Sequence, residues 1–265
     1  MLKHICTRLP LSRTMGSVPH HHRLMSSLLS NLLNGNEQIR AELEQTHSKA
    51  LASDASVTEF CYHRLRPGAM SEYTAMCVDQ ARDARHAAST GAEGFCAVLA
   101  PMVGDLDTVV RITTYPNYAA YELDLNRRIS TAPQHERDLR AMITHRSSIA
   151  CREFAFWAPD DAATPVYDGI YELRSYVLKP GTLLQWGQAW TRGVEARRQL
   201  CTPVGAWFSQ LGGLNQVFHL WHYKNLEERK ISREKAWELD VWAKSVKDTV
   251  PLLQTLNTSI MKRVV

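Results

Sequence analysis

The sequence predicts an α+β fold: two tandem ferredoxin-like β-α-β-β-α-β modules packed sheet to sheet as a dimeric α/β-barrel pseudo-dimer. Three observations lead to this prediction. The chain repeats itself at offsets of 108 to 113 residues, which is the length of a whole domain. The second copy carries strand and helix patterns in the order that this unit requires. A segment rich in Ala, Asp and Pro separates the two copies at 158–165.

The repeat is supported by matched residues that occur in the same order in both copies. The matches are Glu59/Glu172 and Pro67/Pro180 at 113 residues, Leu106/Leu214, Tyr115/Tyr223 and Asn117/Asn225 at 108, and Ser148–Ile149/Ser259–Ile260 with Arg152/Arg263 at 111. The offset changes only between predicted elements, where loops absorb insertions at small cost. The shared order argues against chance similarity.

The first half of the second copy reads as a strand followed by a helix. Residues 170–178 alternate polar and apolar side chains, and Pro180–Gly181 ends this strand. Thr182 is placed to cap the next helix. The helix carries an apolar stripe at helical spacing: Leu183, Trp186, Trp190 and Val194. We expect Trp186 and Trp190 to lie in the core, and an exposed aromatic anchor is the alternative.

The second half of this copy predicts a hairpin, a helix and a last strand. Strands over 204–211 and 214–223 flank Gly212–Gly213. A helical stretch from Leu226 to about Val250 follows, with a break in its middle, and 255–264 form the last strand. The charged run Glu227–Lys230 is expected to be a solvated helix face. The predicted domains are 1–25 (transit peptide), 26–56 (linker with a helix over 37–51), 57–156 (degenerate copy), 157–168 (linker) and 169–265 (second copy).

Charge is distributed unevenly along the chain. Residues 1–25 hold four basic side chains and no acidic one, together with several hydroxyls. This composition is typical of a mitochondrial transit peptide, and a disordered tail without targeting function is the alternative. Without those four residues, basic and acidic side chains are equal in number. A neutral body gives no electrostatic reason to expect nucleic acid or an anionic membrane as a partner.

The apolar runs and the cysteines set further bounds. The longest apolar run, Phe95–Val103, is about half of the roughly 18 residues that a membrane-spanning helix needs, so we predict no span. The six cysteines form no C-x-x-C pair, and without Cys6 their number is odd. Free, buried thiols in a reducing compartment are therefore expected. The sequence has no phosphate loop and no zinc-ligand spacing, so no metal or cofactor is predicted.

Six side chains form the candidate ligand site. Period-2 alternation places three of them on one face of the 170–178 strand and three on one face of the 214–223 strand: Glu172, Arg174, Tyr176, His219, Trp221 and Tyr223. We expect these strands to be neighbours and the cluster to line the cavity between the modules. Arg174 and His219 would then hold an anionic or carbonyl-bearing ligand. The alternative is a satisfied structural network in which Glu172 pairs with Arg174 and Trp221 belongs to the core. No catalytic residue is assigned.

Several runs resemble the NIPSNAP family. They are Tyr171–Tyr176, Leu178–Thr182, Trp186–Gly187, Phe208–Gln210, His219–Trp221 and Thr249–Leu252, with Glu153–Trp157 resembling the inter-domain segment. The likeness is strong over 151–265 and weaker over 57–150. The first copy departs from it, because Arg111 and Thr113 stand where the second copy has His219 and Trp221.

The resemblance implies dimeric α/β-barrel domains, a mitochondrial and largely matrix location, and a role in mitochondrial quality control. It also implies vesicle transport, and display on depolarised mitochondria with recruitment of autophagy adaptors as protein partners. Two other functions stay open. One is a small-ligand binder or cofactor-free oxidative enzyme that uses the barrel cavity. The other is a structural subunit of a mitochondrial assembly. Formation of homo-oligomers also stays open.

Overall fold

The computed structural model describes residues 51–52, 55–86, 96–130, 133–157 and 168–265. The predicted transit peptide, nearly all of the predicted helix over 37–51, and most of the linker between the copies lie outside these ranges. Of the described helices, none is long and apolar enough to cross a membrane. The five described cysteines are all free thiols, as predicted, but the predicted burial holds only for Cys61, Cys77 and Cys151, because Cys96 is exposed and Cys201 is half-buried. Cys6 lies outside the described residues.

The first half of the fold runs strand, helix, strand, strand, two helices, strand. Its elements are β1 (Val57–Leu65), α3 (Met70–His86), β2 (Cys96–Val103), β3 (Thr108–Tyr115), α4 (Tyr118–Ser130), α5 (Pro133–Met142) and β4 (Ile143–Glu153). A short 3-10 helix, η1 (Ala155–Trp157), follows β4.

The second half repeats this order. Its elements are β5 (Ile170–Leu178), α6 (Leu183–Arg198), β6 (Thr202–Leu211), β7 (Gln216–Tyr223), α7 (Leu226–Trp237), α8 (Asp240–Thr249), η2 (Val250–Leu252) and β8 (Leu253–Arg263). The predicted strands and the interrupted helix after Leu226 are confirmed. Thr182 occupies the N-cap position of α6 but does not cap it, because its hydroxyl donates to the carbonyl of Lys179 at 2.7 Å.

The eight strands close into one antiparallel barrel in the order β1-β3-β2-β8-β5-β7-β6-β4. The predicted mixed α/β barrel is therefore confirmed. The two four-stranded sheets do not form separate stacked layers. They join edge to edge, because β2 pairs with β8 and β4 pairs with β6. Within the described residues every barrel strand pairs on both sides, and this removes the free edges at which chains associate in aggregates.

Strand register confirms most of the repeat and corrects its last part. Glu59 lies opposite Thr113, and Glu172 lies opposite Trp221, so the offsets of 113 and 108 both hold. On the other side, Glu59 pairs with Ala150 and Glu172 with Ile260. Equivalent residues of β4 and β8 are therefore 110 apart, and the predicted 111 is wrong. A shift of one residue turns every side chain to the opposite face of a strand, so the difference matters.

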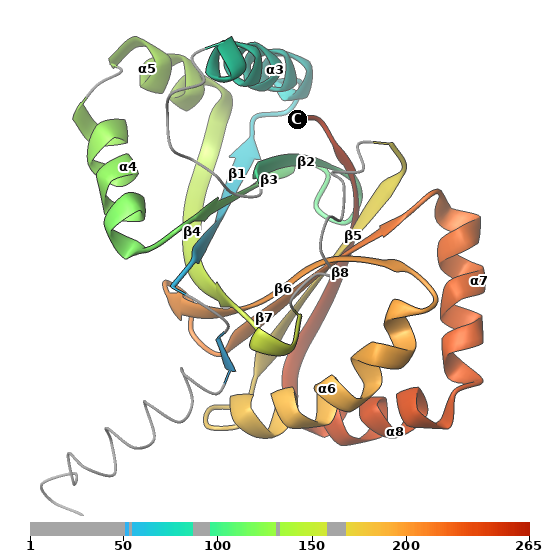
Figure 1. The fold of residues 1–265 in the computed structure, drawn as a ribbon. Helices are drawn as coiled ribbons and strands as arrows, with labels where there is room; N and C mark the ends of the chain where they lie inside the picture. The colour runs from blue at the N-terminus through green and yellow to red at the C-terminus, as the bar shows by residue number, and fades with distance from the viewer. Residues whose placement is uncertain (1–50, 53–54, 87–95, 131–132, 158–167) are drawn as a thin grey trace, which may run out of the picture. The chain divides into compact units, whose positions relative to one another are not determined.

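Two layers of buried side chains follow from this register. The barrel interior is filled from all eight strands, with Phe60, Trp207 and Phe218 at its centre. The outer faces are covered by α3, α4 and α5 on one half and by α6, α7 and α8 on the other (Figure 1). The stripe predicted on α6 packs against the outer face, with Trp186, Trp190 and Val194 buried. Both tryptophans belong to the core, as expected.

Helices α6 and α8 approach closely at Gly193. A Cβ atom built on Gly193 would lie 2.5 Å from both Cβ and Oγ of Ser245. The Ser245 hydroxyl in turn donates to the carbonyl of Ala189 at 3.0 Å, one turn earlier in α6. The glycine therefore allows a hydrogen bond between the two helices that a larger residue would disrupt.

We expect Gly193→Ala to lower the free energy of unfolding by about 1–3 kcal/mol, because the added methyl group overpacks this contact. Gly187→Ala on the same helix is the control. Its Cβ would come closest to the flexible end of Leu51, at 3.2 Å, and would make ordinary contacts with Phe154 and Phe156, so a smaller loss is expected. Urea denaturation of both variants checks this, and an equal loss would contradict the close contact of α6 with α8.

Candidate functional site

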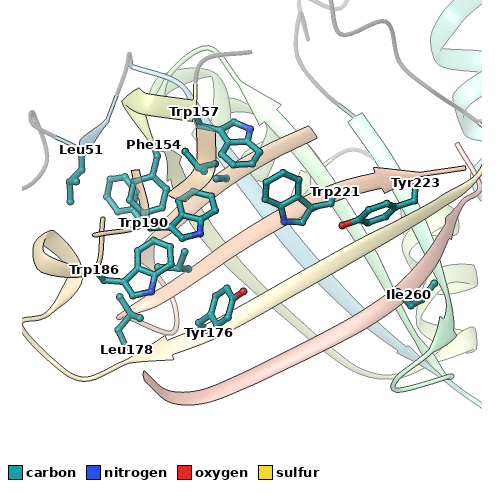
Figure 2. Close-up of a cluster of buried hydrophobic side chains, with 14 of the residues drawn as sticks. Leu51, Phe154, Trp157, Tyr176, Leu178, Trp186, Trp190, Trp221, Tyr223 and Ile260 are labelled. Carbon is teal, nitrogen blue, oxygen red and sulfur yellow. The ribbon is translucent and has the colours of Figure 1, made fainter. Parts of the chain in front are cut away.

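The six candidate residues lie on one face of neighbouring strands, as predicted. Glu172 is directly opposite Trp221, and Arg174 is opposite His219. Tyr176 and Tyr223 lie toward the two ends of the same face. The face is the outer one, under the helices, because Tyr176, Trp221 and Tyr223 share a cluster with Trp186 of α6 (Figure 2).

The prediction that these residues line the cavity between the halves is therefore wrong. The interior of the barrel receives the alternate residues of the same strands, including Tyr171, Leu173, Phe218 and Leu220. In this fold the helices cover the strand face that carries polar and aromatic side chains, and the more uniformly apolar face points into the barrel. Because both faces of these two strands are buried, the pattern of a single strand does not show which face points into the barrel.

A buried carboxylate organises the polar part of the site. Glu172 is fully buried and accepts two hydrogen bonds from Arg229 of α7, at 2.8 and 3.0 Å. Arg174 donates to the same carboxylate at 2.9 Å, and Arg233 lies 3.8 Å from it. Burial alone would raise the pKa of Glu172. The hydrogen bonds of Arg229 and the charge of Arg174 outweigh burial and lower this pKa below 4.5, so the group is ionised.

Tyrosine hydroxyls accept hydrogen bonds from two arginines. Arg174 Nε donates to the hydroxyl of Tyr176 at 2.6 Å. At the other end of the face, the buried Arg197 of α6 donates to the hydroxyl of Tyr223 at 2.9 Å. The guanidinium of Arg197 also lies 5.6 Å from the ring centre of Trp221, within the range of a cation–π contact. The predicted pairing of Glu172 with Arg174 is thus part of a larger network.

His219 lies in an aromatic enclosure. Its ring stacks on Trp190 with centroids 3.8 Å apart, and Trp186 and Tyr176 lie at 5.4 and 5.2 Å. Trp157 stacks on Trp190 at 5.3 Å and lies 6.2 Å from the His219 ring (Figure 2). The Nε2 atom of His219 is buried without a hydrogen-bond partner. Burial, and then the charges of Arg174 and Arg197, hold the pKa of His219 well below 6.5, so the ring is neutral.

The first half holds the equivalent glutamate by different means. Glu59 is buried at the same register and pairs with Arg128 of α4 at 2.8 Å. The hydroxyl of Tyr121 donates to Glu59 at 3.2 Å. Asp124 also binds Arg128 and lies in the same cluster. Arg111, which stands in place of His219, is on this outer face beside Tyr73. The ligating residues of the two halves therefore do not correspond.

Comparison with solved structures agrees with this architecture. A monooxygenase-like protein of Lactobacillus acidophilus has a TM-score of 0.57 at 12% identity, covering 80% of this chain and 95% of that one. An anthrone oxidase-like protein has the same TM-score at 9% identity, covering 80% and 93%. At such low identity the likeness concerns the fold alone.

Sequence comparison decides the family. The NIPSNAP family profile matches residues 171–265, which contain all six candidate residues. NipSnap homolog 1 of Danio rerio is 31% identical over 226 residues, which are 82% of this chain and 79% of the relative. The chain belongs to the NIPSNAP family. Human NipSnap homolog 2 is likewise 31% identical, over 97% of this chain and 89% of its own length.

Sequence reasoning missed two residues of this NIPSNAP site. Arg229 was placed on a solvated helix face, but its side chain reaches inward and binds Glu172 in bidentate geometry. Arg233 was not singled out. A signal was present in the sequence, because the two arginines are spaced i, i+4 and so share one face of α7. What the pattern could not give was the direction in which that face points.

We expect Glu172→Gln to lower the free energy of unfolding by about 3–5 kcal/mol, because it leaves the half-buried guanidinium groups of Arg174 and Arg229 without their counter-charge. Glu227→Gln, at an exposed position of α7, should change it by less than about 0.5 kcal/mol. The depressed pKa means that the Glu172 contribution is present above pH 4.5 and is lost as the pH falls through the lower, folded-state pKa. Chemical denaturation at a series of pH values checks both points. Equal stability of the two variants near neutral pH would contradict this role.

His219 yields a second pH-dependent prediction. In the unfolded chain this imidazole takes up a proton below about pH 6.5, whereas the folded chain holds it neutral. Its contribution to stability therefore falls as the pH drops below that value. We expect His219→Phe, which fills the enclosure and removes the unpaired nitrogen, to flatten the dependence of the melting temperature on pH between about 7 and 5. The control is His145→Phe at an exposed position. Parallel pH profiles of wild type and His219→Phe would overturn the interpretation.

Proposed function

We propose that this NIPSNAP-family chain is a non-enzymatic mitochondrial protein that acts in quality control of the organelle by recruiting protein partners. The observation that carries the proposal is that the ionisable residues of the candidate site are held in structural contacts. The negative charge of Glu172 is balanced by arginines, and His219 is enclosed by aromatic side chains with its pKa depressed. Groups bound in this way stabilise the fold and are poorly placed for acid–base catalysis.

The surface is the region through which partners would act. Five of the seven tryptophans are buried and Trp242 is half-buried, whereas Trp237, the last residue of α7, is 53% exposed. Exposed tryptophan is strongly enriched among residues that dominate protein–protein binding. Trp237, with Ile231 and Val241 also exposed nearby in the sequence, is therefore our candidate contact for a partner. Autophagy adaptors are the partners that the family likeness favours, and vesicle transport is a related role.

We also propose the finer organisation predicted from the sequence. Residues 1–25 would direct import into the matrix, and the two halves would be tandem ferredoxin-like modules that form a pseudo-dimer. The strand orders β4-β1-β3-β2 and β8-β5-β7-β6 within the barrel support the second point. The structural-subunit alternative would give stable co-sedimentation with a large complex.

The test is protease protection of a C-terminally tagged chain in mitochondria isolated from energised and from depolarised cells. We expect the tag to be protected in organelles from energised cells and digested in those from depolarised cells, because import then fails and newly made protein remains outside. A variant lacking residues 1–25 should be digested in both states and serves as the control. Adaptor recruitment to depolarised mitochondria should fall with Trp237→Ala, with Trp242→Phe as the matched variant at a half-buried position. A tag that stays protected in both states would overturn the adaptor proposal.

A further inference from the structure

Three arginines surround the single carboxylate of Glu172, and we refer to Arg174, Arg229 and Arg233 as the arginine cluster. Two of them make hydrogen bonds to Glu172. Arg233 does not, since its closest approach to that carboxylate is 3.8 Å. The carboxylate accepts three donors from Arg174 and Arg229 already, so little of its acceptor capacity is left for a third guanidinium.

Positive charge exceeds negative charge around Arg233. Its strongest charge interactions are with the guanidiniums of Arg174, Arg197 and Arg229, and with one carboxylate, Glu172. Partial burial, and then repulsion by Arg174, lower the pKa of Arg233 below its ordinary value in spite of the attraction of Glu172. The neighbouring Tyr223 and Cys201 add no negative charge, because burial raises the pKa of each group. The excess of positive charge would therefore favour the binding of another anion beside Arg233.

The first half provides an internal comparison. The side-chain caps of α4 and α7 match, since Asn117 Oδ1 accepts from the backbone N–H of Ala120 and Asn225 Oδ1 from that of Glu228, both at 2.9 Å. The three positions of the arginine cluster can therefore be located in the first half: they hold Cys61, Tyr121 and Leu125. There one arginine and one tyrosine satisfy the buried glutamate. Holding a buried glutamate in this fold thus requires neither Arg174 nor Arg233.

The cluster opens toward solvent in steps. The side chain of Glu172 is fully buried, and those of Arg174, Arg229 and Arg233 are 16%, 22% and 34% exposed. Thr258 of β8 lies opposite Arg174 in register, on the same face of the sheet, and is half-buried. An anion arriving from solvent would meet Arg233 first, and then the exposed edges of Arg229 and Arg174. Guanidinium groups suit carboxylates and phosphates because their planar donors bind two oxygens together.

We propose that the arginine cluster binds the oxyanion group, carboxylate or phosphate, of a small molecule on the outer face of the second half. The anion takes the place beside Arg233 and supplies the negative charge that Glu172 alone does not. Glu172 remains in place beneath it and fixes the orientation of Arg174 and Arg229. This inference does not depend on the proposed adaptor function, because it concerns a different set of residues from the exposed side chains around Trp237.

The test is calorimetric titration of the full-length chain with sodium phosphate and, separately, with sodium malonate, at constant ionic strength and near neutral pH. We expect saturable binding of at least one probe. Arg233→Gln should weaken that binding by roughly tenfold to a hundredfold, as expected for one charge-assisted hydrogen bond. Lys230→Gln is the matched control, with the same loss of charge one turn earlier on α7 at a position that is 61% exposed. It should leave the affinity within about twofold.

The same variants also report on the stability of the fold, and the two probes report on the chemical class of the ligand. The melting temperature of unliganded Arg233→Gln should be at least that of Lys230→Gln, because the substitution relieves repulsion within the cluster. Saturation by malonate alone would assign the site to carboxylates, and saturation by phosphate alone to phosphate groups. Absence of saturable binding of both probes, or equal weakening by both substitutions, would overturn the proposal. Neither result bears on protease protection in mitochondria, so the two proposals can fail separately.

Discussion

The burial of one glutamate in each half is the constraint on which the rest of this structure depends. Glu59 and Glu172 lie at the same register, with exposed fractions of 3% and 0%, on the face that the helices cover. A buried carboxylate is tolerated only if a cation and hydrogen-bond donors accompany it. Each half must therefore bring an arginine from the helix that follows its third strand, and this fixes the position of that helix on the sheet.

The two halves compensate the charge of the buried glutamate differently, and this gives their outer faces different charged groups. In the first half, Asp124 and Glu59 share the charge of Arg128. The second half uses three arginines for one carboxylate and surrounds the remainder of the face with tryptophans. Equal folds thus carry unequal chemistry. The proposed interaction with small anions therefore belongs to the second half, whose arginines outnumber its buried carboxylate.

Barrel closure determines which residues remain accessible. The inner layer draws one or two apolar side chains from every strand, and helices cover much of the outer face, although residues 144–148 of β4 and 254–257 of β8 are exposed. Closure also removes free strand edges, because β2 and β4 pair with the other half. The exposed surface includes helix exteriors, hairpins, the rim of the arginine cluster and the exposed stretches of β4 and β8. Partners or ligands would act at such exposed residues.

The sequence by itself determined the repeat, the order of strands and helices in the second copy, the family, and the grouping of six residues on one strand face. These follow from spacing, since alternation with period 2 and stripes at helical spacing are local properties. Tertiary structure decided which face of the sheet the helices cover, and so moved Glu172 and His219 from the expected cavity to a layer beneath α6 and α7. It also decided that Arg229 points inward, and that β4 and β8 align at 110 residues and not 111. Both faces of these strands are apolar enough to be buried, so only the closure of the barrel, which depends on contacts between distant residues, could select the inner face.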